Sequence, residues 1–381
     1  MNKIKRILCV LLCALMLPAM LSGCGKKKDT DEPFVFRASI CSEITSLDPA
    51  MNTDTDANSV FYALYENLMR MSDGGSGEAV LDSGMAKEYS EETNFDGTVT
   101  YTFTLRASAR WSDGQKVTAD DFVYAWQRLA DPATASPNHA LMSVVAGYDE
   151  VRESGDKTKL QVSAKDDATF VVTLSAPCAY FIEGICTAVA TMPLRRDLAE
   201  STAFDKAPLV SNGAYYAEKW SQGGELTAAR NAEYYEARIV GPDTLHFVFA
   251  DSSREAWELY ENGEIDYVDH LPDEVIAELS QQSGWTAREI LATVCVLYNN
   301  ETDLFSNEHI RMAFDLAIDR TAVTKAAGAE NRAATGLVPH GIPDAGETED
   351  DFRTTGGTLC AIDEESLGER QDKGREEVTF A

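Results

Sequence analysis

The chain has 381 residues, of which 44% are hydrophobic and 25% are charged, and its formal net charge is −30 at pH 7. This length is enough for two or three domains with a sizeable hydrophobic core. The strong negative charge excludes binding to nucleic acid or to an anionic membrane by bulk electrostatics, because both would repel an acidic surface.

Residues 1–24 have the pattern of a processing signal. Three basic residues precede an apolar stretch at 7–17, which is too short to span a bilayer. The Leu-Ser-Gly-Cys sequence at 21–24 is typical of a bacterial lipoprotein signal peptide, so we expect Cys24 to be lipidated. The lipid would hold the chain on the outer face of the bacterial cell membrane, at the cell surface or in the periplasm. An ordinary secretory cleavage site is the alternative, and residues 25–33 form a tether in either case.

The first predicted elements follow this tether. Residues 34–40 favour a strand, and a loop with the sequence S-E-I-T-S-L-D-P comes after it at 42–49. Asp54 or Thr55 would cap a helix that ends before the Asp-Gly-Gly sequence at 73–75. Its inward residues recur at intervals of three and four residues: Val60, Phe61, Leu64, Tyr65, Leu68 and Met69.

Residues 101–137 contain the strongest local signals. Tyr101, Phe103 and Leu105 alternate with threonines, which predicts a half-buried strand. The Trp-Ser-Asp-Gly sequence at 111–114 is a turn. Thr118 and Asp121 have capping-box spacing, which predicts a helix start. The helix would bury one face and stop at Asp-Pro, 131–132, with these inward residues: Phe122, Trp126 and Leu129.

Further elements continue to residue 320. We expect strands at 170–174, 242–249 and 294–299, helices at 254–262 and 308–320, and a helical or looped apolar segment at 177–190. The Ser-Asn-Gly-Ala-Tyr sequence at 211–215 predicts a tight turn into another strand.

The stretch 101–137 resembles the extracytoplasmic oligopeptide-binding proteins of ABC importers, the family 5 solute-binding proteins. The similarity rests on R-x-x-A-x-W-S-D-G-x-x-V-T-A-x-D-F-V-Y-x-W-x-R at 106–128 and D-P-x-T-A-S-P at 131–137. Weaker similarities occur in the 42–49 loop, N-G-A-Y at 212–215, R-N-x-x-Y-Y at 230–235, G-E-I-D at 263–266 and the helix at 310–320. The resemblance runs from about residue 34 to residue 343.

The resemblance implies an α/β, periplasmic-binding-protein-like type II (cluster C) fold of two lobes with an extra domain. Lobe I would comprise residues 34–55 and 176–296, the extra domain 56–175, and the start of lobe II 297–345. Residues 346–381 form an atypical tail. Because family members continue further, we expect an incomplete second lobe, truncated or frameshifted after about residue 345; an authentic short variant is the alternative.

The same resemblance implies a monomeric lipoprotein that captures oligopeptides and delivers them to ABC permease subunits. The alternatives are a peptide-pheromone receptor of this fold, a binding protein for nickel, haem or sugar, and a non-functional remnant. The expected ligand contacts are Glu43, Ile44, Thr45, Tyr124, Trp126, Asn212, Gly213, Tyr215, Tyr298 and Asn299.

The sequence contains no catalytic or metal-binding motif. It has no P-loop, H-E-x-x-H, G-x-S-x-G or G-x-G-x-x-G, and its five histidines and eight cysteines lack zinc-site spacing. We therefore expect no enzyme activity, no cofactor and no metal. Beyond the signal and Cys24, isolated thiols or a single disulfide are both open for Cys41, Cys178, Cys186, Cys295 and Cys360.

Overall fold

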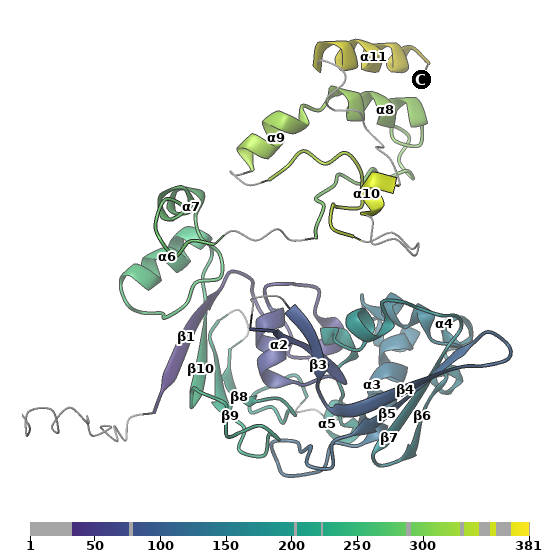
Figure 1. Cartoon of the computed structure of the whole chain (residues 1–381), viewed down its shortest axis with the longest axis vertical. Coiled ribbons are helices and arrows are strands. Elements are labelled where there is room, and N and C mark those ends of the chain that lie inside the picture. The colour runs from purple at the N-terminus through teal and green to yellow at the C-terminus, as the bar shows by residue number, and fades with distance from the viewer. Residues whose placement is uncertain are drawn as a thin grey trace, which may run out of the picture. The chain divides into compact units, whose positions relative to one another are not determined.

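The computed structural model describes residues 33–75, 79–201, 204–221, 224–286, 291–327, 331–342, 351–355 and 367–380. The chain forms two compact units, Met1–Leu271 and Pro272–Ala381 (Figure 1). The predicted lobe boundary at 296/297 falls inside the second unit, and all of the predicted domain limits stay predictions. The signal peptide, Cys24, most of the tether and Cys360 lie outside the described residues.

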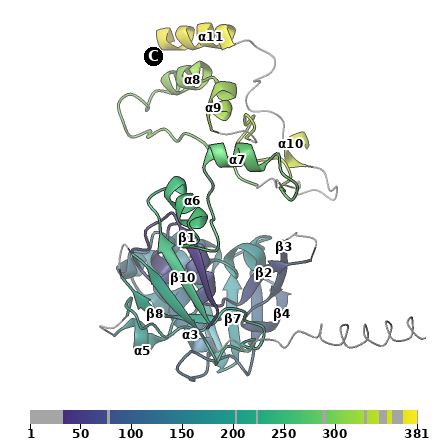
Figure 2. The same ribbon diagram turned by 90° about the vertical axis from the view of Figure 1, so that its left-hand side faces the viewer.

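A mixed four-stranded sheet forms one part of the first unit (Figure 2). Its order is β1-β10-β9-β8, with β1 parallel to β10 and the other neighbours antiparallel. The predicted strands at 34–40 and 242–249 are confirmed as β1 and β10. The bounds are β1 Val35–Ile40, β8 Tyr215–Trp220, β9 Leu226–Arg230 and β10 Thr244–Phe249.

An antiparallel sheet with the order β4-β5-β7-β6 forms the other part. In β5, buried and half-buried residues alternate along the whole strand, which confirms the period-2 prediction. The predicted strand at 170–174 is β7. The bounds are β4 Ala86–Thr93, β5 Val99–Leu105, β6 Val162–Asp166 and β7 Thr169–Leu174, with a separate hairpin of β2 Met69–Asp73 and β3 Ala79–Ser83.

Helix α3 (Ala119–Ala130) packs on this second sheet, chiefly at β6 and β7. Its start confirms the capping prediction, because the Asp121 carboxylate accepts a hydrogen bond from the Thr118 backbone N–H at 2.8 Å. The same carboxylate accepts a bond from the Trp111 indole N–H at 3.2 Å. The Trp-Ser-Asp-Gly turn is thereby tied to the first turn of α3.

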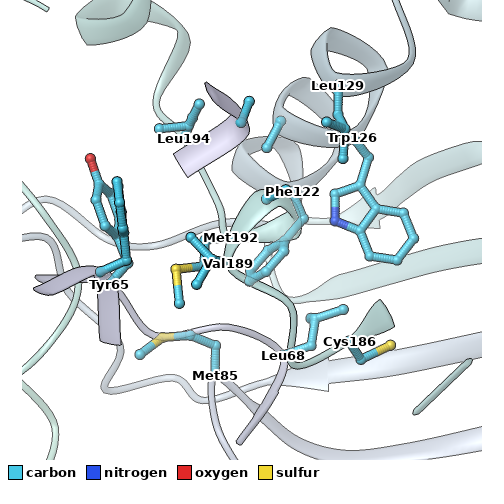
Figure 3. Close-up of a cluster of buried hydrophobic side chains, with 14 of the residues drawn as sticks. Tyr65, Leu68, Met85, Phe122, Trp126, Leu129, Cys186, Val189, Met192 and Leu194 are labelled. Atoms are coloured by element: carbon cyan, nitrogen blue, oxygen red, sulfur yellow. The ribbon is translucent and has the colours of Figure 1, made fainter. Parts of the chain in front are cut away.

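Aromatic and aliphatic side chains join α3 to the segments around it (Figure 3). Trp126 is fully buried, meets Phe170 edge to face at 5.1 Å between ring centroids, and donates its indole N–H to the Thr191 carbonyl at 2.9 Å. Satisfying that donor lets the large ring be buried without an unpaired polar group. The neighbours labelled in Figure 3 include Leu68, Met85, Cys186, Val189, Met192 and Leu194.

The remaining helices of the first unit are short. The helix predicted after Asp54 ends earlier than expected, because α2 stops at Leu64 and Leu68 and Met69 are buried where the chain turns into β2. The bounds are α2 Asn58–Leu64, α4 Tyr148–Ser154, α5 Arg196–Ala199, α6 Ser253–Glu261, the 3-10 turns Pro49–Met51, Pro132–Thr134, His139–Val144, Lys157–Lys159 and Val189–Thr191, and the π-helix Phe181–Ile185.

The described residues of the second unit form helices joined by irregular segments. The strand predicted at 294–299 is wrong: this segment is irregular, and Val294 and Leu297 are 99% and 86% exposed. No strand of the described part of this unit offers it a partner. The helix predicted at 308–320 divides, because Asp319 accepts the Ala322 N–H at 3.0 Å and caps a new helix. The bounds are α7 Asp273–Leu279, α8 Glu308–Ala317, α9 Arg320–Ala326, α10 Phe352–Thr355 and α11 Leu367–Phe380.

Helices α8 and α11 pack against each other within the second unit. A Cβ added at Gly374 of α11 would lie 3.1 Å from the Ala313 carbonyl oxygen of α8, and His309 Nδ1 lies 2.7 Å from Glu377 Oε2. Across the described parts of the chain, no helix is long and apolar enough to cross a bilayer. The four described cysteines are free thiols: Cys41, Cys178, Cys186 and Cys295.

Candidate functional site

The carboxyl ends of β1 and β10 meet at one edge of the first sheet. The two strands pair in parallel from Val35 with Thr244 to Ile40 with Phe249. On the other side of β1, the Ser39 N–H donates to the Tyr267 carbonyl at 3.1 Å, so residues 266–270 run beside the strand. In open α/β sheets, ligands bind beyond the carboxyl ends of parallel strands, so this edge is the first place to search for a site.

A cavity of about 380 Å³ lies in this part of the first unit. Three aromatic side chains form much of its apolar wall, and the Phe36 and Tyr267 ring centroids are 6.3 Å apart. We call it the edge cavity. It is lined by the apolar residues Phe36, Ala38, Phe247 and Tyr267 and the polar residues Ser39, Thr55, Asp56, Ser59, Asp269 and His270.

Two carboxylates and one imidazole organise the polar side of the edge cavity. His270 Nε2 lies 3.0 Å from Asp56 Oδ1, and the Ser42 hydroxyl donates to Asp56 Oδ2 at 3.1 Å. Asp269 Oδ1 accepts the His270 backbone N–H at 3.0 Å and the Ser39 hydroxyl at 3.4 Å. Both carboxylates are therefore held in place from more than one side.

The electrostatics of this cluster favour positive charge. The hydrogen bond to Asp56 raises the pKa of His270; burial opposes this effect, whereas the charges of Asp56, Asp269 and Asp54 add to it. Burial and the nearby carboxylates raise the pKa of Cys41 to about 11, so its thiol is protonated at neutral pH. Cys41 therefore supplies no thiolate nucleophile at neutral pH.

The 42–49 loop begins next to the edge cavity and is fixed at its far end. Asp48 forms an ion pair with Arg128 of α3 at 2.5 Å, and Asp205 accepts hydrogen bonds from the Leu47 N–H and the Ser46 hydroxyl. Of the predicted contacts in this loop, Glu43 and Thr45 are exposed, whereas Ile44 is buried in the core. The loop thus presents alternate side chains from a fixed backbone.

The other predicted contacts of the first unit are buried and do not line the edge cavity. Tyr124 and Trp126 belong to the buried face of α3, and the Tyr215 hydroxyl donates to the Pro242 carbonyl at 3.1 Å. The Asn212 side chain binds both the N–H and the C=O of Glu66, at 3.2 and 2.8 Å. A Cβ at Gly213 would lie 2.5 Å from the Leu64 carbonyl carbon. These contacts hold segments of the fold together.

Tyr298 and Asn299 belong to the second unit. Tyr298 is half-buried against Phe305, with ring centroids 5.0 Å apart, and the Asn299 side chain accepts the Glu301 N–H at 3.0 Å. A ligand contact stays a prediction for these two residues, as it does for the other predicted positions.

Sequence reasoning missed the polar residues of the edge cavity. Asp56, Asp269 and His270 carry no motif. The pairing of residues 266–267 with β1 brings Asp269 and His270 to the cavity, and the contact of His270 with Asp56 completes the cluster. Neither Asp56 nor Asp269 directly follows a predicted strand, so no pattern in the sequence pointed to this cluster. Among the described residues, no group of three or more His, Cys, Asp or Glu side chains is placed to hold a metal ion.

Comparison with known proteins places this chain beside solute-binding proteins. A sequence profile of bacterial extracellular solute-binding proteins, family 5 (middle), matches residues 82–363. The match passes residue 343, so the expectation that the resemblance ends there is corrected.

Two relatives and one solved structure illustrate the similarity. The chain is 27% identical to the dipeptide-binding protein DppE of Bacillus subtilis over 97% of this chain and 67% of that protein. It is 33% identical to the periplasmic oligopeptide-binding protein OppA of Salmonella typhimurium over 74% of this chain and 52% of that protein. The structure of Haemophilus influenzae OppA in complex with RPPGFSPFR matches with a TM-score of 0.77 and 27% identity, over 92% of this chain and 67% of that chain. The chain thus spans between half and two thirds of these proteins, and the type II binding-protein fold class is confirmed.

Proposed function

Because the chain belongs to the bacterial extracellular solute-binding proteins of family 5, we propose that it captures short peptides outside the cytoplasm for import by an ABC permease. The observation that carries this proposal is its similarity to a dipeptide-binding protein along 97% of its own length. Members of this family are solute-binding proteins, not enzymes, which agrees with the lack of catalytic motifs in the sequence.

The geometry of the first unit suits an extended peptide. Backbone pairing with a peptide gives affinity that does not depend on its sequence, and pockets beside the backbone accept individual side chains. The 42–49 loop, with Glu43 and Thr45 exposed, would supply the backbone contacts, and the edge cavity would take one side chain. The binding protein would act as a monomer, and its partners would be permease subunits.

Isothermal titration calorimetry of the full chain tests this function. Trialanine and a mixed tripeptide pool should bind, whereas maltose and Ni²⁺ should not. Binding of a sugar or of Ni²⁺ together with no heat from any peptide would overturn the assignment.

A further inference from the structure

The edge cavity combines two features that together recognise a cation on an apolar stem. Its aromatic wall includes Phe36 and Tyr267, and its polar side includes the carboxylates of Asp56 and Asp269. Aromatic faces attract cations and also pack against the methylene groups of lysine or arginine. Carboxylates then pair with the charged end.

The cavity contains little positive charge of its own. Among the described residues that line it there is no lysine or arginine, and its one group that can become a cation is His270. His270 lies 3.0 Å from Asp56 and its side chain is 51% exposed, so it can leave this partner for solvent without unfolding. Asp56 is less exposed, at 26%, and stays bonded to Ser42.

Acidic groups surround the imidazole from several segments. Asp54 and Asp56 precede α2, Asp269 lies beside β1, and their charges act on His270. Glu255 of α6 acts on the nearby Cys41 thiol together with Asp56 and Asp269, and Tyr267 is a further titratable residue of the cavity lining. A ligand cation entering here would meet attraction from all of the carboxylates and competition from one protonated imidazole.

We propose that the edge cavity receives a lysine or arginine side chain of the bound peptide, which replaces His270 as the charge partner of Asp56. This inference rests on the proposed function, because the basic side chain is part of a captured peptide. The stem of that side chain packs against the aromatic wall that includes Phe36 and Tyr267, and its charged end pairs with Asp56 on the polar side that also holds Asp269. Affinity for a basic peptide then rises with pH as His270 loses its proton, whereas lysine stays charged throughout this range.

Calorimetry on the full chain tests the proposal with Ala-Lys-Ala and Ala-norleucine-Ala, which differ in the ammonium group. The lysine peptide should bind about tenfold more tightly at pH 8, the size expected for a hydrogen-bonded charge pair. This preference should shrink towards pH 5.5 in the unchanged protein and stay constant with pH in His270→Gln. Equal affinities for the two peptides at pH 8 would overturn the proposal.

Substitutions locate the charge partner. Asp56→Asn, which keeps an acceptor for Ser42, should remove most of the preference for lysine, and Asp269→Asn should reduce it. The matched control is Asp96→Asn at the exposed β4–β5 turn, which should leave the preference unchanged. If the preference for lysine persists in both Asp56→Asn and Asp269→Asn, the assignment is wrong. Binding of Ala-norleucine-Ala to each variant shows that the variant is folded.

The peptide's α-ammonium group is the other possible source of the cation. N-acetylated Ala-Lys-Ala and N-acetylated Ala-norleucine-Ala separate the two sources. If the cavity takes the side chain, the tenfold ratio persists after acetylation; if the ratio disappears, the side-chain proposal is wrong. Peptides that bind without any preference contradict this inference alone, whereas the absence of binding by every peptide contradicts the proposed function as well.

Discussion

Glu66 shows how a single buried carboxylate can make the stability of this fold depend on pH. Its side chain accepts a hydrogen bond from the Tyr234 hydroxyl at 2.5 Å and lies 3.6 Å from Arg70. Burial raises the pKa of Glu66, although the bond from Tyr234 and the charge of Arg70 oppose this effect. A carboxyl whose pKa is raised by folding binds its proton more tightly in the folded state.

We predict that Glu66→Gln removes a pH-dependent part of the free energy of unfolding. The contribution of the native Glu66 is fully present below the pKa of an unfolded glutamate, about 4.3, and is lost as pH rises through its raised folded pKa. Urea unfolding at pH 4, 5.5 and 7 should therefore show the native protein losing stability relative to Glu66→Gln as pH rises. The control is Glu88→Gln, at an exposed position of β4. If the difference in the free energy of unfolding between the native protein and Glu66→Gln is the same at all three pH values, the prediction is wrong.

At the scale of elements, the sequence predicts best where the signal is local. Strand β5 and helix α3 follow from alternation, turn chemistry and a cap within a few residues of one another. The segment 294–299 has apolar residues at strand spacing, but strand formation depends on a distant partner that the segment itself does not specify. The edge cavity escaped prediction for the same reason, since Asp269 reaches it through the pairing of residues 38 and 267, which are far apart in the sequence.

At Gly213, a close contact with the chain at Leu64 and Tyr65 requires a glycine in the turn. A Cβ there would lie 2.5 Å from the Leu64 carbonyl carbon and 2.6 Å from the Tyr65 nitrogen, where the backbone must shift. We predict that Gly213→Ala lowers the free energy of unfolding by roughly 1–3 kcal/mol, the usual cost of overpacking. Gly241→Ala is the matched control, because its added Cβ meets no atom within 4 Å. Thermal unfolding followed by circular dichroism measures both, and equal melting temperatures would refute the steric argument.

At the scale of the whole molecule, the net negative charge and the N-terminal sequence have different effects on whether the protein attaches to a membrane. A net charge of −30 gives no electrostatic attraction to an anionic membrane, so charge alone does not attach the chain to one. The Leu-Ser-Gly-Cys sequence supplies the candidate attachment site at Cys24.

We predict that Cys24→Ala abolishes labelling by radioactive palmitate and moves the protein from the membrane fraction to the soluble fraction. The reason is that the Cys24 thiol is the expected site of lipid attachment, and a net charge of −30 gives no attraction to an anionic lipid surface. Cys41→Ala provides the control with a different thiol removed, and it should label normally. Continued labelling of Cys24→Ala would show that the lipid is attached elsewhere.

The position of β1 has a mechanical consequence for an anchored chain. The tether leads directly into this strand, which is held along one side by β10 and along the other by residues 266–267. The Arg37 guanidinium adds a two-pronged bond to Asp266, at 3.0 and 2.8 Å. A pull on the anchor along the strand axis therefore loads all these bonds in shear at the same time. The attachment resists such a pull better than a strand that is peeled from one end, because the bonds of a peeled strand open one at a time.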